Sequence, residues 1–136
     1  FSKYKRELEE DPTKAERELS RVMILLDKTI DIEKTEDLAA FFRAYIKNDI
    51  SWDDFCELSE ALNRMFISDR RLLFDVSEGK KNLTYENGGY SADRLISIGL
   101  IQNPSIGMSM RYNVSPNSQS RLKPTTLGTM YINLLA

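Results

Sequence analysis

The sequence predicts a mainly α (α+β) protein, in which a helical N-terminal portion packs on a smaller C-terminal portion that carries a β-hairpin. Apolar residues recur at spacings of three and four through the first half of the chain, which is the period of amphipathic helices. Residues 108–114 instead alternate between apolar and polar, which is typical of a strand, and polar turns flank them. We place the two portions at residues 1–78 and 79–136 and expect them to form one compact unit.

Composition supports an ordinary globular chain. The 136 residues are 41% hydrophobic and 29% charged, which is within the range of one compact domain. No apolar run approaches the roughly 20 residues that a membrane-spanning helix needs. The single cysteine, Cys56, has no partner for an internal disulfide and fits a reducing compartment, so we expect a cytoplasmic location. A first residue other than Met, Phe1, is consistent with a trimmed fragment.

Capping residues divide the N-terminal portion into helices. A short charged helix is predicted over residues 4–10, and Asp11 and Pro12 then supply the N-cap and first position of a second helix. Residues 31–36 are interpreted as a polar break before a third helix, and Ser51 with Asp54 forms a capping-box variant that opens a fourth. The second helix is expected to bury one apolar stripe, made of Leu19, Val22, Met23, Leu26 and Ile30.

The C-terminal portion mixes helices with turn and strand signals. Ser68 is expected to cap a helix that runs through Val76, and residues 79–82 and 86–89 have the composition of turns. Ser91 is expected to cap a short helix over residues 92–98 that ends at Gly99. Residues 121–123 are the predicted pairing partner of the strand over 108–114, and Thr125 or Thr126 is predicted to cap a closing helix.

The residue types present exclude several kinds of chemistry. The chain has no His, so imidazole acid–base catalysis, His-based triads and His zinc sites are absent. Residues 48–55 echo half of a calcium-binding loop, but the other half places Arg43, Tyr45 and Lys47 where oxygen ligands are required. An acidic cluster at Asp31, Glu33, Glu36 and Asp37 is expected to stay solvated at a helix N-terminus. We therefore predict no enzyme activity, no metal and no cofactor.

The charge is distributed unevenly along the chain. Residues 1–66 carry 11 basic and 16 acidic side chains, whereas residues 67–136 carry 8 basic and 5 acidic ones. Beyond residue 93 the only side chains that are charged at neutral pH are basic, at Arg94, Arg111, Arg121 and Lys123. This excess is modest for a nucleic-acid-binding surface.

Three adjoining segments resemble the end of a winged-helix domain: a helix that ends in Gly99-Leu100-Ile101, the hairpin over 108–122, and the sequence from Leu122 to Gly128 that enters a final amphipathic helix. The resemblance implies that residues 92–98 form a recognition helix and that the hairpin is the wing. Winged helices bind DNA in some proteins and other proteins elsewhere. The whole chain also loosely resembles uncharacterised small proteins encoded by bacterial phages and prophages.

Our leading hypothesis is a non-enzymatic binding or regulatory module, of bacterial or phage origin, that acts through protein–protein contacts or self-association. The candidate partner-binding residues are the aromatic side chains Phe41, Phe42, Tyr45 and Trp52. The alternative is a winged-helix DNA-binding transcriptional regulator, and the resemblance assigns DNA contacts to Ser91, Arg94, Ser97, Arg111, Arg121 and Lys123.

Overall fold

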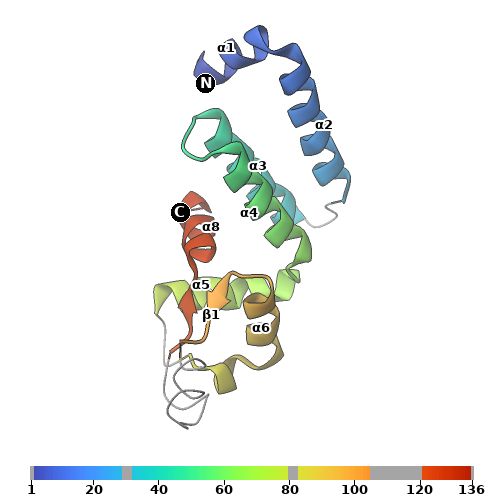
Figure 1. Cartoon of the computed structure of the whole chain (residues 1–136). Coiled ribbons are helices and arrows are strands. Elements are labelled where there is room, and N and C mark those ends of the chain that lie inside the picture. The colour runs from blue at the N-terminus through green and yellow to red at the C-terminus, as the bar shows by residue number, and fades with distance from the viewer. Residues whose placement is uncertain (1, 29–31, 80–82, 105–120, 136) are drawn as a thin grey trace. The chain divides into compact units, whose positions relative to one another are not determined.

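The computed structural model describes residues 2–28, 32–79, 83–104 and 121–135. The protein is mainly helical, with a small two-stranded antiparallel sheet near the C-terminus (Figure 1). The chain divides into two compact units, residues 1–63 and residues 64–134. The sequence boundary at residue 78 therefore differs from this division, because the helix over residues 70–78 belongs with the second unit. Within the described ranges no helix is long and apolar enough to cross a membrane.

The N-terminal unit contains α1 (Ser2–Glu10), α2 (Pro12–Lys28), α3 (Ile32–Ile46) and α4 (Trp52–Arg64). The predicted caps form as hydrogen bonds. The carboxylate of Asp11 accepts from the backbone N–H of Lys14 at 3.0 Å, which confirms Asp11 as a cap of α2. The Ser51 hydroxyl accepts from the Asp54 N–H at 3.0 Å while the Asp54 carboxylate accepts from the Ser51 N–H at 3.2 Å. The capping box that starts α4 is therefore confirmed.

The stripe predicted for α2 is wrong in its position on the helix. Val22 is 8% exposed, but Leu19, Met23 and Leu26 are 46%, 63% and 40% exposed, and Ile30 lies outside the described residues. The buried face instead carries Leu25, which is 1% exposed, and Glu18, which is 5% exposed. Successive residues of a helix lie about 100° apart, so Met23 and Leu25 point to nearly opposite sides. Because α2 is apolar on two faces, the periodicity alone did not identify which face packs on the unit.

Two further expectations for the N-terminal unit are corrected. The predicted break over residues 31–36 is wrong from Ile32 onward, because α3 begins at that residue, and residue 31 lies outside the described residues. Glu33 lies in the first turn of α3, where a carboxylate stabilises the helix dipole. Asp37 is 2% exposed and so does not remain solvated as predicted. The core of the unit is formed by apolar residues of α2, α3 and α4, with Phe41, Phe55 and Leu58 fully buried.

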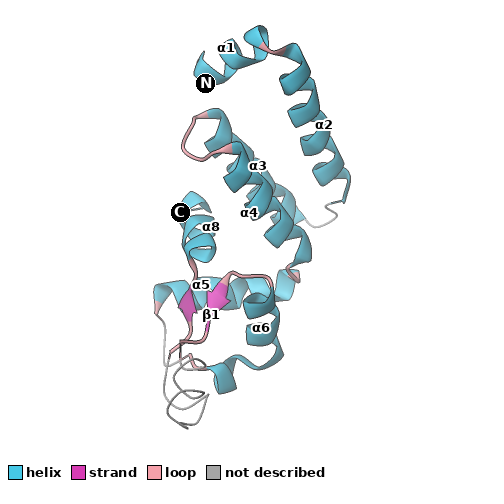
Figure 2. Cartoon of the chain, viewed as in Figure 1, coloured by secondary structure: helices cyan, strands magenta, loops and turns pink. Residues whose placement is uncertain are grey.

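The C-terminal unit begins with a single 3₁₀ turn, η1 (Ile67–Asp69), followed by α5 (Arg70–Glu78) and α6 (Tyr85–Ser97). The strands β1 (Ile101–Gln102) and β2 (Lys123–Pro124) pair antiparallel, Ile101 opposite Pro124 and Gln102 opposite Lys123 (Figure 2). An isolated bridge joins Thr84 to Arg121. The helix α8 (Thr126–Leu135) closes the chain, and the Thr125 hydroxyl accepts from the Gly128 N–H at 3.0 Å as the predicted cap.

Three local predictions in this unit are corrected. The helix α5 begins at Arg70, after η1, and has no side-chain cap, so Ser68 does not cap it. The turn predicted over residues 86–89 is helical, because Thr84 caps α6 and the helix continues from Tyr85 until Gly89 kinks it at a φ of 58°. Ser91 therefore follows the kink and does not cap the helix. Gly99 has a φ of 85°, as expected for a left-handed helix end.

The strand predicted over residues 108–114 lies outside the described residues. In the described part of the chain, its expected partner pairs elsewhere: Arg121 bridges to Thr84, and Lys123 pairs with Gln102. The core of this unit includes Leu73, Ala92, Leu95, Leu100 and Tyr131, each of which has no exposed surface. The buried apolar side chains of this unit thus come both from the helices and from the segments in and beside the two strands, which contribute Leu100, Ile101 and Leu122.

Close packing of α8 requires a glycine. A Cβ placed on Gly128 would lie 2.0 Å from the backbone carbonyl oxygen of Leu100, and this oxygen is part of the chain and cannot rotate away. The absence of a side chain therefore lets α8 approach the segment before β1.

We expect Gly128→Ala to lower the free energy of unfolding by about 2 kcal/mol, because the overpacking cost exceeds the gain of about 1 kcal/mol in helix propensity. Thr129 is exposed on the next position, so Thr129→Ala is the control and should change stability by less than about 0.5 kcal/mol. Urea unfolding followed by circular dichroism measures both. Equal stability of Gly128→Ala and the wild type would contradict the close approach.

Candidate functional site

In the C-terminal unit, one buried carboxylate links η1 to α6. Asp69, at the end of η1, has no exposed surface. Its two oxygens accept hydrogen bonds from Nε and Nη2 of Arg94, both at 2.7 Å, and one of them also accepts from the Ser91 hydroxyl at 2.7 Å. The guanidinium of Arg94 also lies 4.7 Å from the ring centre of Phe66. These contacts tie η1 and the residue before it to α6.

This geometry stabilises the ionised form of Asp69. The hydrogen bonds from Arg94 lower the pKa of Asp69 below its ordinary value, outweighing the opposing effect of burial, and the hydrogen bond from Ser91 adds to the lowering. The same contact raises the pKa of Arg94. Both groups are therefore charged at neutral pH, and the pair is a fixed part of the fold.

The predicted DNA-contact residues are separated by this arrangement. Ser91 and Arg94 are bound to Asp69, while Ser97 is exposed at the end of α6. Arg121 is exposed, and its guanidinium donates to the carbonyl oxygen of Gly79 at 2.6 Å. Lys123 is exposed in β2, and Arg111 lies outside the described residues.

The surface of α6 carries little positive charge. Arg94 is its only basic residue, and it is engaged by Asp69. The exposed Asp93 accepts a hydrogen bond from the hydroxyl of Tyr85, and this contact raises the pKa of Tyr85. Tyr90 is 83% exposed. A helix with this surface offers an aromatic ring and a carboxylate, whereas the strongest contacts with phosphates come from cations.

Three of the four predicted partner-binding aromatic residues, Phe42, Tyr45 and Trp52, form one cluster with Phe55 in the N-terminal unit. Phe41 has no exposed surface and Tyr45 is 9% exposed, so both are core residues. Phe42 and Trp52 are partly exposed. The ring of Trp52 stacks on Phe55 with centres 5.1 Å apart and meets Tyr45 edge-on at 5.2 Å. The hydroxyl of Tyr45 donates to the carboxylate of Glu18, at 2.8 Å from each oxygen, which ties the cluster to α2.

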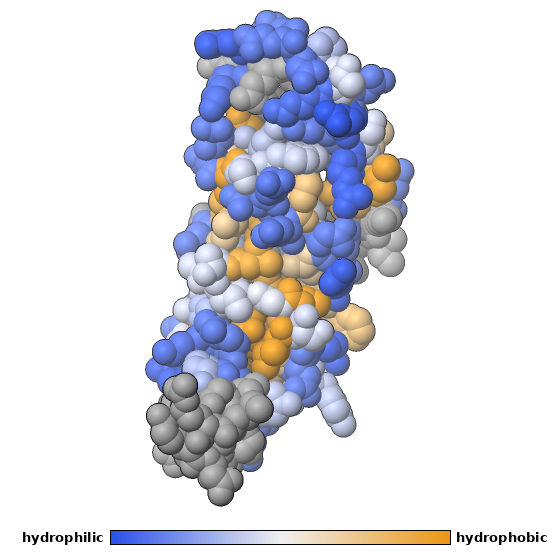
Figure 3. Space-filling model, viewed as in Figure 1, coloured by the Kyte–Doolittle hydropathy of each residue, from blue (hydrophilic) through white to orange (hydrophobic). Residues whose placement is uncertain are grey.

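The sequence reasoning missed the exposed apolar face of α2, because it assigned that stripe to the core. We define the outer face of α2 as Leu19, Met23 and Leu26, which are spaced by four and three residues and lie on one side of the helix. Ile24 is also 48% exposed, but it points to a different side of α2. Apolar atoms are visible at the outer edge of α2 in the space-filling view (Figure 3). The exposed carboxylates of Glu16 and Asp27 flank the same side of the helix.

The described residues show no group of three or more His, Cys, Asp or Glu side chains arranged to hold a metal ion. Cys56 is half-buried, and burial raises the pKa of its thiol. A raised pKa keeps the thiol protonated at neutral pH, whereas a nucleophilic cysteine needs a lowered one.

Comparison of the chain with protein-family models, with curated proteins and with solved structures finds no match. The geometry of the described residues is therefore the whole basis for a functional assignment.

Replacing Arg94 with Met should destabilise the protein by about 3 kcal/mol at pH 7, because the carboxylate of Asp69 would remain buried without its charged partner. In the wild type the lowered pKa means that the pair stabilises the fold above the ordinary carboxyl pKa and loses this contribution as the pH falls through the lowered value. In Arg94→Met the carboxyl can be protonated more readily, so the difference between the two proteins should shrink below about pH 4.

Urea unfolding of both proteins at a series of pH values makes this measurement. The matched control is Arg71→Met, since Arg71 is exposed on α5. If the wild type and Arg94→Met differed in stability by the same amount at pH 7 and at acidic pH, Arg94 would not be compensating the charge of Asp69.

Proposed function

We propose that this protein is a non-enzymatic binding module that contacts another protein chain through the outer face of α2. The observation that carries this proposal is the exposure of Leu19, Met23 and Leu26 on one side of a helix whose other side is already packed. A helix that is apolar on both sides is usually covered on both. Isolated exposed apolar residues are common, but a contiguous row at this spacing is typical of a docking surface.

The spacing and the flanking charges define the partner. Apolar residues separated by four and three positions form the seam of helix–helix packing, so the partner that fits is an amphipathic helix. Glu16 and Asp27 border the outer face and are both exposed. A partner helix with Lys or Arg beside its apolar stripe would complement these carboxylates.

For the C-terminal unit we propose a winged-helix-like arrangement that serves as a scaffold. Its order supports this interpretation: α5, the bridge at Thr84, the kinked helix α6, then β1, β2 and α8. In this interpretation the part of α6 after Gly89 is the recognition helix, and most of the hairpin that the sequence predicts as the wing, residues 108–122, falls outside the described ranges. Arg94 then has a structural role, because it neutralises Asp69.

The DNA-binding alternative is favoured by one observation, the exposure of Arg121 and Lys123 next to the bridge and β2. Under our proposal, these cations give only weak association with labelled duplex DNA, lost at physiological salt, because counterion release is the main driving force. Fluorescence anisotropy at low and physiological salt distinguishes the two functions. Saturable binding at physiological salt that Lys123→Ala weakens would replace our proposal with DNA recognition.

Met23→Glu should abolish partner binding without loss of stability, because Met23 is 63% exposed and a buried carboxylate in the interface would be unpaired. The probe is a labelled amphipathic helical peptide with Leu at alternating spacings of four and three and Lys beside the stripe. We expect at least tenfold weaker binding of the probe by Met23→Glu. Thr129→Glu, which makes the same charge change on the exposed surface of α8, should bind as the wild type does.

Light scattering on the chain alone completes the test. A dimer that Met23→Glu dissociates would identify a second copy of this chain as a partner and support the proposal. A monomer that fails to bind the peptide, or equal binding by Met23→Glu and the wild type, would overturn it.

A further inference from the structure

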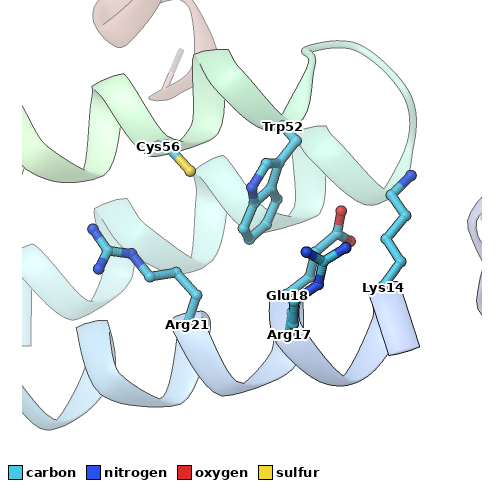
Figure 4. Close-up of a pocket in the computed structure, with 6 residues that line it drawn as sticks. All are labelled: Lys14, Arg17, Glu18, Arg21, Trp52 and Cys56. Atoms are coloured by element: carbon cyan, nitrogen blue, oxygen red, sulfur yellow. The ribbon is translucent and has the colours of Figure 1, made fainter. Parts of the chain in front are cut away.

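The N-terminal unit contains a pocket of about 480 Å³ between α2 and α4. This volume is within the range of sites that hold small organic molecules. One wall is α2 and the opposite wall is the first turns of α4 (Figure 4). The pocket lies on the inner side of α2, away from the outer face. Its lining residues are Lys14, Arg17, Glu18, Arg21, Trp52 and Cys56.

The pocket is predominantly cationic. Lys14, Arg17 and Arg21 are spaced by three and four residues, so they project from one side of α2. Arg21 is paired with Glu60 at 2.9 Å, on the surface. The guanidinium of Arg17 has no hydrogen bond or ion pair with any described residue. Arg17 is thus a bidentate donor at the pocket that the described part of the fold does not use.

The one acidic residue in the wall is fixed by the core. Glu18 is 5% exposed, and both of its oxygens lie 2.8 Å from the hydroxyl of Tyr45. This carboxylate and the faces of the aromatic rings beside it would attract an organic cation, so the charge of the remaining lining residues decides which ligand is favoured. Because Glu18 is held by Tyr45 and Arg21 is paired with Glu60, the guanidinium of Arg17 makes an anion the favoured ligand.

Trp52 supplies a flat apolar wall. Its indole is fixed by stacking on Phe55 and by the edge-on contact with Tyr45. The indole N–H of this partly exposed Trp makes no hydrogen bond to a described residue, so it can donate to a ligand. In Figure 4 the ring projects from α4 towards α2, between Arg21 on one side and Arg17 with Glu18 on the other. A planar ring can therefore lie beside the indole while an attached anionic group reaches Arg17.

We propose that this pocket binds a mononucleotide, with the base against Trp52 and the phosphate bound by Arg17 and Lys14. Stacking on an aromatic side chain tolerates any base, and a guanidinium binds phosphate through parallel hydrogen bonds. The thiol of Cys56 lines the pocket as a neutral group and takes no part in a reaction. This site is independent of partner binding, because the residues of the outer face of α2 do not line it.

The single tryptophan of the chain makes the site directly observable. The protein is titrated with AMP, with adenosine and with ribose 5-phosphate while the fluorescence of Trp52 is recorded. Free tryptophan titrated with the same compounds corrects for their absorbance, and calorimetry measures the same binding in parallel. We expect saturable binding of AMP, with adenosine and ribose 5-phosphate each at least tenfold weaker. Each fragment keeps only one of the two interactions, which explains the expected loss.

The matched variants are Arg17→Gln and Arg43→Gln, since Arg43 is exposed on α3 and does not line the pocket. Arg17→Gln should weaken the binding of AMP at least tenfold and leave the binding of adenosine unchanged. Arg43→Gln should change the affinity for neither ligand. Circular dichroism confirms that both variants are folded.

Three results would overturn the proposal: no binding of AMP by either method, ribose 5-phosphate binding as tightly as AMP, or equal loss of AMP binding in both variants. The second result would mean a simple anion site, and the third would mean general attraction to positive charge. Binding of AMP that Met23→Glu leaves unchanged separates this site from the proposed protein interface.

Discussion

The buried carboxylate of Asp69 is the constraint on which the C-terminal unit depends. A carboxylate with no exposed surface is costly unless it is paired and hydrogen-bonded, and here Arg94 and Ser91 of α6 supply those contacts. The pairing fixes the register of α6 against η1, because the two donors are three residues apart on one side of the helix. It also places the guanidinium of Arg94 against Phe66. The basic residue that a recognition helix would direct to DNA is thereby used within the protein.

In the N-terminal unit, α2 has a comparable organising role, because each of its sides has a different environment. Val22, Leu25 and Glu18 face the unit, and the hydrogen bonds from Tyr45 to Glu18 link this side to the aromatic cluster. Arg17 and Arg21 line the pocket beside α4. Leu19, Met23 and Leu26 remain exposed. One helix thus contributes different sides to the core, to the proposed ligand pocket and to the proposed protein interface.

The sequence predicted features that depend on neighbouring residues. The caps at Asp11, Ser51 with Asp54, and Thr125 were correct because a cap is formed within one turn of the helix. Gly99 was correct because a left-handed helix end favours glycine. Ser91 was misassigned as a cap because its hydroxyl donates to Asp69, which is 22 residues away and has no signature in the local pattern. Neither the pocket nor the role of Arg17 had a sequence signal, since α2 and α4 are separated by another helix.

The sequence by itself thus determined that the protein is mainly helical, where several helices begin and end, and that no histidine chemistry is present. These properties follow from residue type and from spacing along one helix. Only the tertiary structure decided which side of α2 is buried, that Arg94 is committed to Asp69, and that Trp52 and Arg17 share a pocket. The physical reason is that burial and pairing depend on which surfaces meet, and two apolar sides of one helix have the same periodicity until one of them is covered.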